Sequence, residues 1–230
     1  MNKSRLLLFF LFWLALIADC ILMFKKLDAY RVYTKTLLAP LLLVAIFLES
    51  VNTKHRRSKI LVNLAFFFCF LGDFLLLNDA EPANFMMGLC AFLAAHILFI
   101  FFFYRLKPFT SKHELFIFIA AIIILGYIVF LLSLVWLNAG RQGLQIPVSV
   151  YALALGFMLL CAVNTIKNKS IRRIASAYFI PGAMFFVLSD SALAINKFFV
   201  LFKYGGIVVM CTYAMALFLL ANGIMRFLKK

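Results

Sequence analysis

The sequence predicts an all-α, polytopic integral membrane protein in which residues 1–230 form one bundle of about eight transmembrane helices. Apolar residues make up 67% of the chain and charged residues only 13%, about half the charged fraction of a soluble domain. The apolar residues fall into successive runs of roughly 20, the length that a helix needs to cross a hydrocarbon core about 30 Å thick. The breaks between the runs are short, so we expect a single domain without a linker.

Each expected helix is one of these runs, bounded by basic, glycine or proline residues that are typical of loops and helix ends. The helices are expected at residues 5–24, 34–50, 59–78, 82–104, 113–137, 145–166, 171–197 and 204–227. The first run follows Lys3 and Arg5 as a signal peptide would, but it is long and lacks an A-x-A cleavage site, which favours a retained first helix. The second run contains Pro40, which predicts a kink that neighbouring helices can compensate.

The formal charge of +15 is carried mainly by the breaks between the runs. Because Lys and Arg are not gathered on one amphipathic face, we expect them to set membrane topology and not to bind nucleic acid. With the N-terminus inside, sixteen basic residues lie on the inner side and seven on the outer side. This bias predicts a multi-pass protein of the bacterial inner membrane with both termini in the cytoplasm.

Two of the expected helices carry the same motif at an offset of 117 residues. Residues 68–76 and 185–193 both fit F-x-x-L-(G/S)-D-x-x-L, and Gly88 and Gly205 share the offset. Helices four apart cross the bilayer in the same direction, so the motif indicates a weak, parallel four-plus-four repeat.

Of the eight acidic residues, three lie within apolar runs: Asp19, Asp73 and Asp190. A carboxylate near the bilayer centre costs on the order of 3 kcal/mol on insertion scales, so it usually faces a cavity or a partner. Asp19 is close to Lys25 and Lys26, and we expect a surface ion pair there. Asp73 and Asp190 have no basic neighbour in the sequence, which favours a functional role for the pair over a structural hydrogen-bonding role.

Other polar side chains are expected at similar depths in the outer half of the bundle. The two aspartates lie roughly 6–8 and 10 Å below the outer ends of their helices at 1.5 Å per residue. Tyr151, Tyr213 and His96 lie roughly 9, 15 and 18 Å in by the same rise, and Lys35 stands at the start of the second helix. Taken singly, each tyrosine or histidine is as often an interface anchor or a packing residue. Their common depth predicts one pocket lined by six helices.

The sequence contains little that would support a metal site or a covalent nucleophile. His55 and His113 fall in breaks, so only His96 could join the aspartates, and no ligand-spacing motif surrounds them. The five cysteines lie in apolar runs without a C-x-x-C pair, as small buried hydrophobes do. The chain has no G-x-S-x-G elbow, P-loop or Cys–His pair. We therefore expect carboxylate acid–base chemistry, with no metal and no cofactor.

Several motifs occur together over nearly the whole chain. They are Lys35 with Pro40, Leu71-Gly72-Asp73, Phe85-x-x-Gly88 through His96, Pro147 with Val150-Tyr151, Gly182-Ala183 through Ser189-Asp190 to Asn196-Lys197-Phe198, and Tyr213. In this combination the chain resembles the YhhN family of membrane lysoplasmalogenases. It departs from that family at Thr36, Phe99 and Leu217, where the family often has Pro, Tyr and Gln.

The resemblance implies hydrolysis of the vinyl ether bond of lysoplasmalogens to a fatty aldehyde and glycerophosphoethanolamine or glycerophosphocholine. A vinyl ether opens when its outer carbon is protonated and water captures the resulting oxocarbenium ion. That chemistry needs one protonated carboxyl and one ionised carboxylate, and Asp73 and Asp190 are the expected catalytic pair. The residues expected to bind the lysophospholipid substrate are Lys35, His96, Tyr151, Asn196, Lys197 and Tyr213. Either Lys35 or Lys197 is expected to neutralise the phosphate.

Two other functions stay open at this point. A transporter or lipid-binding membrane protein would use the aspartates to relay protons or coordinate ions, and would be expected to show strong repeats and broken helices around the site. A hydrolase or transferase could also act on another lysolipid, through a metal. In all three cases the partners are membrane lipids or small substrates.

Overall fold

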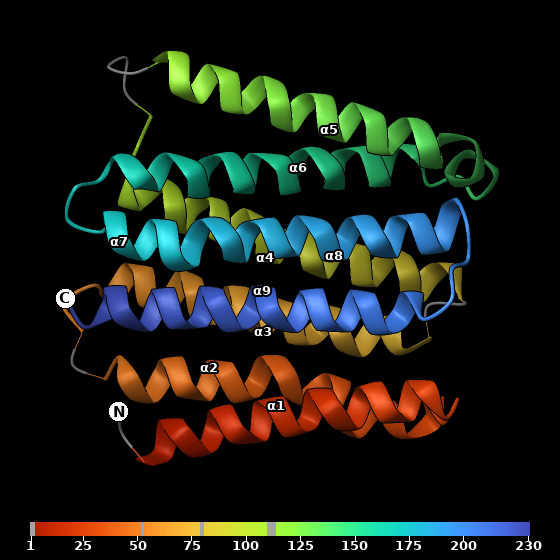
Figure 1. The fold of residues 1–230 in the computed structure, drawn as a ribbon, viewed down its shortest axis with the longest axis horizontal. Helices are drawn as coiled ribbons and strands as arrows, with labels where there is room; N and C mark the ends of the chain where they lie inside the picture. Colours follow the sequence, from red (N-terminus) through yellow and green to blue (C-terminus); the bar gives the residue numbers. More distant parts are fainter. Residues whose placement is uncertain (1–2, 52, 79–80, 110–113) are drawn as a thin grey trace.

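The computed structural model of the chain describes residues 3–51, 53–78, 81–109 and 114–230. Within these residues all regular structure is helical, and eight segments are long and apolar enough to cross a membrane. The segments lie side by side, with the first beginning and the last ending at the same end of the bundle (Figure 1). The predicted all-α, polytopic bundle is confirmed. His113, the first residue expected for the fifth helix, lies outside the described residues.

Eight long helices make up the spans. They are α1 (Lys3–Phe24), α2 (Leu38–Glu49), α3 (Arg56–Leu75), α4 (Pro82–Leu106), α5 (Glu114–Arg141), α6 (Gln145–Asn164), α8 (Ile180–Phe198) and α9 (Gly205–Leu228). Short turns extend four spans: η1 (Asp28–Tyr33) and η2 (Lys35–Leu37) before α2, η3 (Leu76–Asn78) after α3, η4 (Thr165–Lys167) after α6, and α7 (Arg172–Ile174) with η5 (Ala175–Phe179) before α8. We use "outer end" for the end at which α3 and α8 finish, following the predicted topology.

The second and seventh spans are irregular, but not in the way the sequence predicts. Pro40 is the third residue of α2, where its missing N–H removes no intrahelical bond because the first turn has no partners for its amides. The irregular part lies before it, in the two 3-10 turns η1 and η2. In the seventh span a π-helical turn, η5, leads into α8 shortly before Pro181. The sequence predicts a regular helix over these residues, without this turn.

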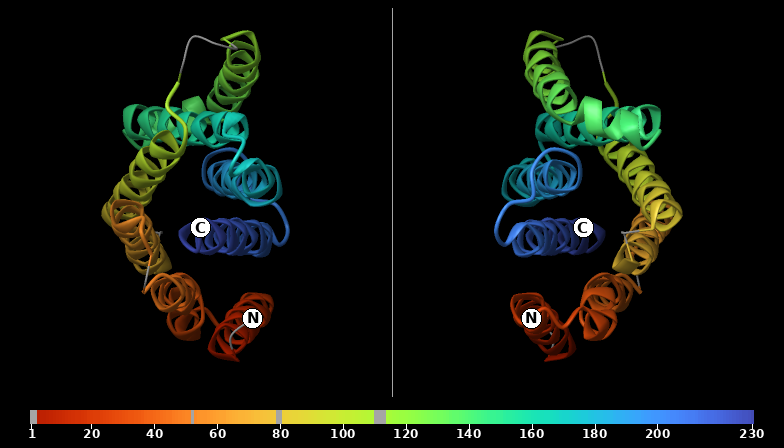
Figure 2. Two further views of the ribbon diagram at one scale, coloured as in Figure 1. Left: turned by 90° about the vertical axis from the view of Figure 1, so that its left-hand side faces the viewer. Right: turned by 90° about the vertical axis from the view of Figure 1, so that its right-hand side faces the viewer.

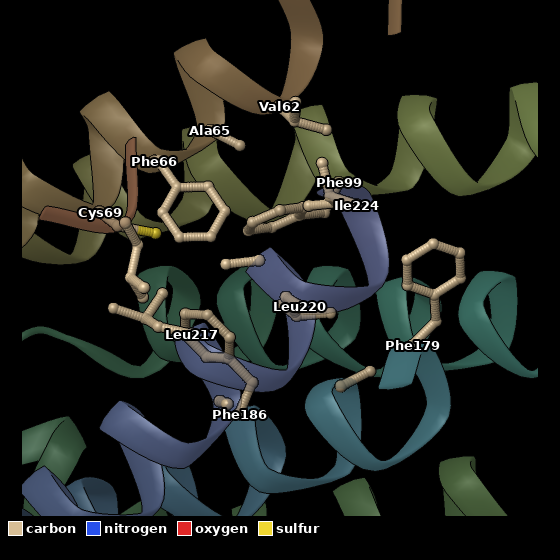
Figure 3. Packing of buried hydrophobic residues seen from close by; sticks show 14 of the residues in the cluster. Val62, Ala65, Phe66, Cys69, Phe99, Phe179, Phe186, Leu217, Leu220 and Ile224 are labelled. Carbon is tan, nitrogen blue, oxygen red and sulfur yellow. The ribbon is translucent and has the colours of Figure 1, made fainter. Parts of the chain in front are cut away.

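A large apolar core fills the space between α3, α4, α8 and α9. The side chains that meet there include Val62, Ala65, Phe66, Cys69, Phe99, Phe179, Phe186, Leu217, Leu220 and Ile224 (Figure 3). Lipid is as apolar as these side chains, so close packing and not the exclusion of water holds the helices together. Phe99 and Leu217, two of the three departures from the family pattern, are both fully buried in this core.

The five free cysteines divide between the interior and the surface of the bundle. Cys69 and Cys161 are buried as expected, whereas Cys90 and Cys211 are exposed and Cys20 is partly exposed. The exposed ones face outward from helices whose outer surfaces are apolar, so the prediction of buried cysteines holds for only two of them.

Seen along the helix axes, most of the spans form a ring, and α1 and α5 lie outside it (Figure 2). The ring runs α2, α3, α4, α6, α8 and α9, and α9 closes it by packing against both α8 and α2. Outside the ring, α1 packs on α2 and α5 packs on α6. The most apolar stretch of α5 is only 11% buried against 56% for α9, which marks α5 as the most peripheral span.

The helix packing repeats in two halves, α1–α4 and α5–α9. In the first half α1 packs on α2, α2 on α3, α3 on α4, and α4 on α6 of the other half. In the second half α5 packs on α6, α6 on α8, α8 on α9, and α9 on α2. Each contact of the second half joins the two spans that lie four positions later in the chain than the spans of the matching contact in the first half. The count continues from the eighth span to the first. This order of contacts is the one that an approximate twofold rotation about an axis along the bundle produces, in agreement with the weak four-plus-four repeat of the sequence.

Candidate active site between the two halves

Asp73 lies in the last turn of α3 and has only 1% of its surface exposed. Tyr213 of α9 donates a hydrogen bond from its Oη to Asp73 Oδ2 at 2.7 Å. Lys35 of η2 attracts the same carboxylate electrostatically. Its Nζ also donates to the carbonyl oxygen of Leu76 at 3.2 Å, which fixes the lysine at the end of α3, where helix carbonyls lack intrahelical partners. Asp73 thus has a hydrogen-bonded tyrosine and a neighbouring cation.

Asp190 of α8 lies in a different hydrogen-bonding environment. Tyr151 of α6 donates from its Oη to Asp190 Oδ2 at 2.5 Å. His96 Nε2 of α4 lies 3.3 Å from the same oxygen and 2.9 Å from the Tyr151 Oη. The buried His96 Nδ1 has no hydrogen-bond partner among the described residues, so the hydrogen bonds place the ring proton on Nε2, where acceptors are available. The Asp190 side chain is 12% exposed, more than Asp73.

Each carboxylate is held by a residue from the opposite half of the chain. Asp73 of the first half is bonded by Tyr213 of the second, and Asp190 of the second half is bonded by His96 of the first. His96 and Tyr213 are separated by 117 residues, as Asp73 and Asp190 are. The two contacts are therefore one contact repeated by the approximate twofold axis, as in an isologous dimer interface. The site is complete only when both halves pack together.

Both carboxylates line one cavity of about 230 Å³ at the outer end, which we call the polar cavity. Its polar lining consists of Arg31, Lys35, Asp73, Ser189, Asp190, Asn196 and Tyr213. The volume is sufficient for several water molecules, which polar walls of this kind can hold. The structure therefore brings five of the expected site residues to one cavity. His96 and Tyr151, which contact Asp190, are not among the residues that line this cavity.

A second cavity of about 40 Å³ adjoins the polar cavity at Asp190. The two share Leu76, Phe92, Asp190 and Leu193. The rest of its lining is almost entirely apolar and consists of Phe85, Leu89, Val148, Tyr151, Ala194 and Phe198. We call it the apolar cavity. Asp190 thus lies where a polar space meets an apolar one.

Asn196 and Lys197, adjacent in sequence, have different surroundings. Asn196 lines the polar cavity, and its Oδ1 accepts a hydrogen bond from the backbone N–H of Phe202 at 3.4 Å. The Nζ of Lys197 lies over the ring of Phe85, 5.0 Å from its centroid. The structure does not bring Lys197 to the cavity that holds Lys35, so only one of the two lysines expected near a phosphate lies there.

The expected surface ion pair of Asp19 is wrong. Asp19 is fully buried and accepts hydrogen bonds from Arg31 Nε at 3.3 Å, Arg31 Nη2 at 3.4 Å and Thr34 Oγ1 at 2.8 Å. Arg31 also lines the polar cavity. The sequence did not identify it as a site residue, because it lies close to a break, where basic residues are expected to set membrane topology. The available signal is its position four residues before Lys35, the spacing that places two side chains on one helical face.

The fold and the site together define a multi-pass membrane protein with two buried carboxylates at an intramembrane polar cavity. Within the described residues, no group of three or more His, Cys, Asp or Glu side chains is arranged to hold a metal ion. The family model of the YhhN family matches residues 30–224, and the chain belongs to this family. No curated protein and no solved structure matches it closely enough to infer a relationship.

Proposed function

We propose that the protein is a membrane hydrolase that cleaves the vinyl ether bond of lysoplasmalogens by carboxylate acid–base catalysis. The observation that carries this proposal is the convergence of Asp73 and Asp190 on one cavity in a member of the YhhN family. The cavity is large enough for water, and its walls change from polar to apolar at Asp190. Both features suit the hydrolysis of an amphiphilic ether.

The reaction needs a proton on carbon and a water molecule. One aspartic acid protonates the outer carbon of the double bond, which leaves an oxocarbenium ion at the ether-bearing carbon. The other aspartate, ionised, stabilises that cation and takes a proton from the attacking water. The resulting hemiacetal collapses to a fatty aldehyde and the alcohol of the glycerophospholipid. Water is the only co-reactant.

The two carboxyl groups have different surroundings, as a reaction that needs one carboxylic acid and one carboxylate requires. Asp190 has two hydrogen-bonding neighbours on one oxygen, Tyr151 and His96. Asp73 has the single tyrosine Tyr213 and the cation Lys35. Hydrogen bonds and nearby cations both change the balance between a carboxyl and its carboxylate, so the same side chain in the two halves is placed in two chemical settings.

The test is aldehyde release from lysoplasmalogen by protein purified in detergent. Asp73→Asn and Asp190→Asn should each abolish release, because each removes one proton carrier while keeping the shape of the side chain. Glu81→Gln is the matched control, since Glu81 is an exposed acid at the start of α4 and its loss should leave the rate unchanged. Full activity in both aspartate variants, with unfolding temperatures like the parent, would refute the mechanism.

A transporter remains the principal competing function, and the interrupted spans bear on it. Transporters built from repeats break corresponding helices in the two halves. Here the interrupted spans are the second and the seventh, which do not correspond, because the repeat pairs the second span with the sixth. The π-helical turn also lies at the opposite end of its span from Asp190. Proton-driven uptake into vesicles without product formation would support transport instead.

We also propose that the outer end of the bundle faces the periplasm of a bacterial inner membrane, so that the polar cavity opens to the outer leaflet. The proposal rests on the bias of loop Lys and Arg. Lys26 and Lys169 are exposed residues at opposite ends of the bundle. In a variant without native cysteines, Lys26→Cys should react with a membrane-impermeant thiol reagent applied to whole cells, and Lys169→Cys should not. The reverse pattern would invert the orientation.

A further inference from the structure

The two cavities occupy equivalent places in the two halves of the chain. Several residues that line the polar cavity differ by 117 in residue number from a residue that lines the apolar cavity. The exchanged pairs are Arg31 with Val148, Asp73 with Asp190, Leu76 with Leu193, Leu77 with Ala194, Gly206 with Leu89, and Val209 with Phe92. The cavities are therefore two copies of one feature, related by the same approximate axis that relates the carboxylates.

The two copies differ in charge. The first has Arg31 and Lys35 in its wall, whereas the corresponding positions in the second half are Val148 and Ala152. Arg31 is firmly placed, because its Nε and Nη2 both donate to the buried Asp19. The first copy thus carries two cationic side chains. In the second half, Val148 takes the position of Arg31 and lines the apolar cavity, whereas Ala152 takes the position of Lys35 and lies outside that cavity.

The copies also differ in width. Gly206 of α9 stands in the polar cavity where its counterpart Leu89 of α4 stands in the apolar cavity. A glycine contributes no side chain and a leucine contributes four carbons, which is consistent with volumes of about 230 and 40 Å³. One copy suits a hydrated, anionic group, and the other suits the beginning of a single hydrocarbon chain.

We infer that the site binds its substrate across the axis, with a phosphodiester head group in the polar cavity and one hydrocarbon chain in the apolar cavity. This inference rests on the proposed function and gives it an orientation: the ether bond lies between the two aspartates. Arginine and lysine are the side chains that bind phosphate by charge-assisted hydrogen bonds. Asp19 is a positioning residue, since it acts on the ligand only through Arg31.

The chemical class that fits is a single-chain glycerophospholipid. A phosphodiester carries one negative charge, which Arg31 and Lys35 can neutralise beside the carboxylates. The apolar cavity is small, and two of its lining residues are Phe85 and Phe198, whose rings meet edge to face with centroids 5.7 Å apart. Its volume of about 40 Å³ suits the start of one chain, as the one-chain lipid of the proposed function requires.

Binding without turnover tests this placement separately from the reaction. The probe is a saturated 1-O-alkyl glycerophosphoethanolamine, which lacks the double bond that takes up the proton and so is not cleaved. Its affinity for the full chain in lipid nanodiscs is compared with those of glycerophosphoethanolamine, a 1-O-alkylglycerol and inorganic phosphate. Each of the first two competitors should displace part of the probe, one through each cavity. If inorganic phosphate competes as well as glycerophosphoethanolamine, the assignment to a lipid head group is overturned.

Variants in the polar cavity should affect only ligands that carry phosphate. Arg31→Met should weaken probe binding by about 10-fold or more, the effect of losing a hydrogen bond to a charged group, and should leave alkylglycerol binding within about twofold. Arg31→Lys should restore part of the affinity. Because Arg31→Met leaves Asp19 without its cation, the double variant Asp19→Asn/Arg31→Met, which removes both charges, is measured beside it. Equal loss of alkylglycerol and probe binding would overturn the head-group site.

Variants in the apolar cavity should affect only ligands that carry a chain. Leu89→Trp fills the cavity and should weaken the probe and the alkylglycerol alike without changing glycerophosphoethanolamine. Met87→Trp is the matched control, since Met87 is 47% exposed on the outer face of the same helix. Leu89→Ala, which is gentler on the fold, widens the cavity and should raise the affinity for a methyl-branched chain relative to a straight one. Unchanged chain preference in both Leu89 variants would overturn the chain site.

The outcomes separate the inference from the proposed reaction. If the wild-type chain shows this binding pattern but releases no aldehyde from the alkenyl lipid, the two subsites stand and the proposed reaction fails. If aldehyde is released but binding responds to neither Arg31 nor Leu89, the reaction stands and the placement of the substrate is wrong.

Discussion

Removal of one oxygen atom, in Tyr213→Phe, tests whether Asp73 depends on its partner from the opposite half. The Tyr213 Oη is the atom that donates to Asp73 Oδ2 at 2.7 Å. A hydrogen bond to a charged group contributes about 1.5–3 kcal/mol, so its loss should lower kcat/KM for aldehyde release by about 10- to 150-fold. The loss falls in this range if the bond persists into the transition state.

The fold should survive this change, because phenylalanine keeps the ring contacts of the tyrosine. The Tyr213 ring meets Phe92 edge to face with centroids 5.7 Å apart, and Phe186 with centroids 5.6 Å apart. The unfolding temperature in detergent should therefore change little compared with the activity.

Tyr127→Phe is the matched control for this experiment. The Tyr127 Oη donates to Ser191 Oγ at 2.8 Å, a bond of similar length that lies outside the polar cavity, in the groove between α5, α6 and α8. Its removal should leave the rate within about twofold. If Tyr213→Phe keeps full activity while Asp73→Asn is inactive, or if both tyrosine variants lose activity equally, the reasoning from this hydrogen bond is refuted.

Three further predictions concern the fold around the site. Asp19→Asn should lower stability by about 2 kcal/mol, the size of a lost hydrogen bond to a charged group, because it leaves the partly buried Arg31 without its closest counter-ion. Asp28→Asn, at a side chain 73% exposed, should not lower it; equal unfolding temperatures would contradict this. Gly205→Ala should lower the unfolding temperature, since a Cβ there would lie 2.4 Å from Asn196 Oδ1, while Gly126→Ala meets no atom within 4 Å and should raise it slightly through helix propensity. Treatment with diamide should link Cys20 to Cys211, whose sulfur atoms are 3.9 Å apart, and mass spectrometry of the peptides would detect the link; its absence would question the packing of α1 on α9.

The spans were predictable because the cost of unsatisfied backbone groups in lipid leaves apolar helices as the main solution for such a chain. Their internal irregularities were not. Pro40 marks a helix start as readily as a kink, since the first turn of a helix does not need the amide that proline lacks. The π-helical turn at Ala175–Phe179 depends on how the seventh span packs against its neighbours, which no local spacing reports.

The candidate site was predictable in part, for a related reason. Asp73 and Asp190 stand out because a carboxylate in an apolar run is costly, and their common motif pointed to equivalent places. Which donor meets which acid depends on packing between the halves, so the crossed pairing with Tyr213 and His96 was not visible. Arg31 was missed because its partner Asp19 lies across a break. Burial of that ion pair follows from tertiary structure alone.

The twofold exchange between the halves also bears on ancestry. A four-span polypeptide that formed a dimer about the same axis would already have brought both aspartates together. Each aspartate would accept a hydrogen bond from the other subunit, and the dimer would have two identical cavities. Because its two cavities would be identical, such a symmetric dimer would bind either end of a ligand equally well in each cavity. Joining the copies into one polypeptide allows each cavity to change independently, and the differences at Arg31 and Leu89 make the two cavities of this chain unlike.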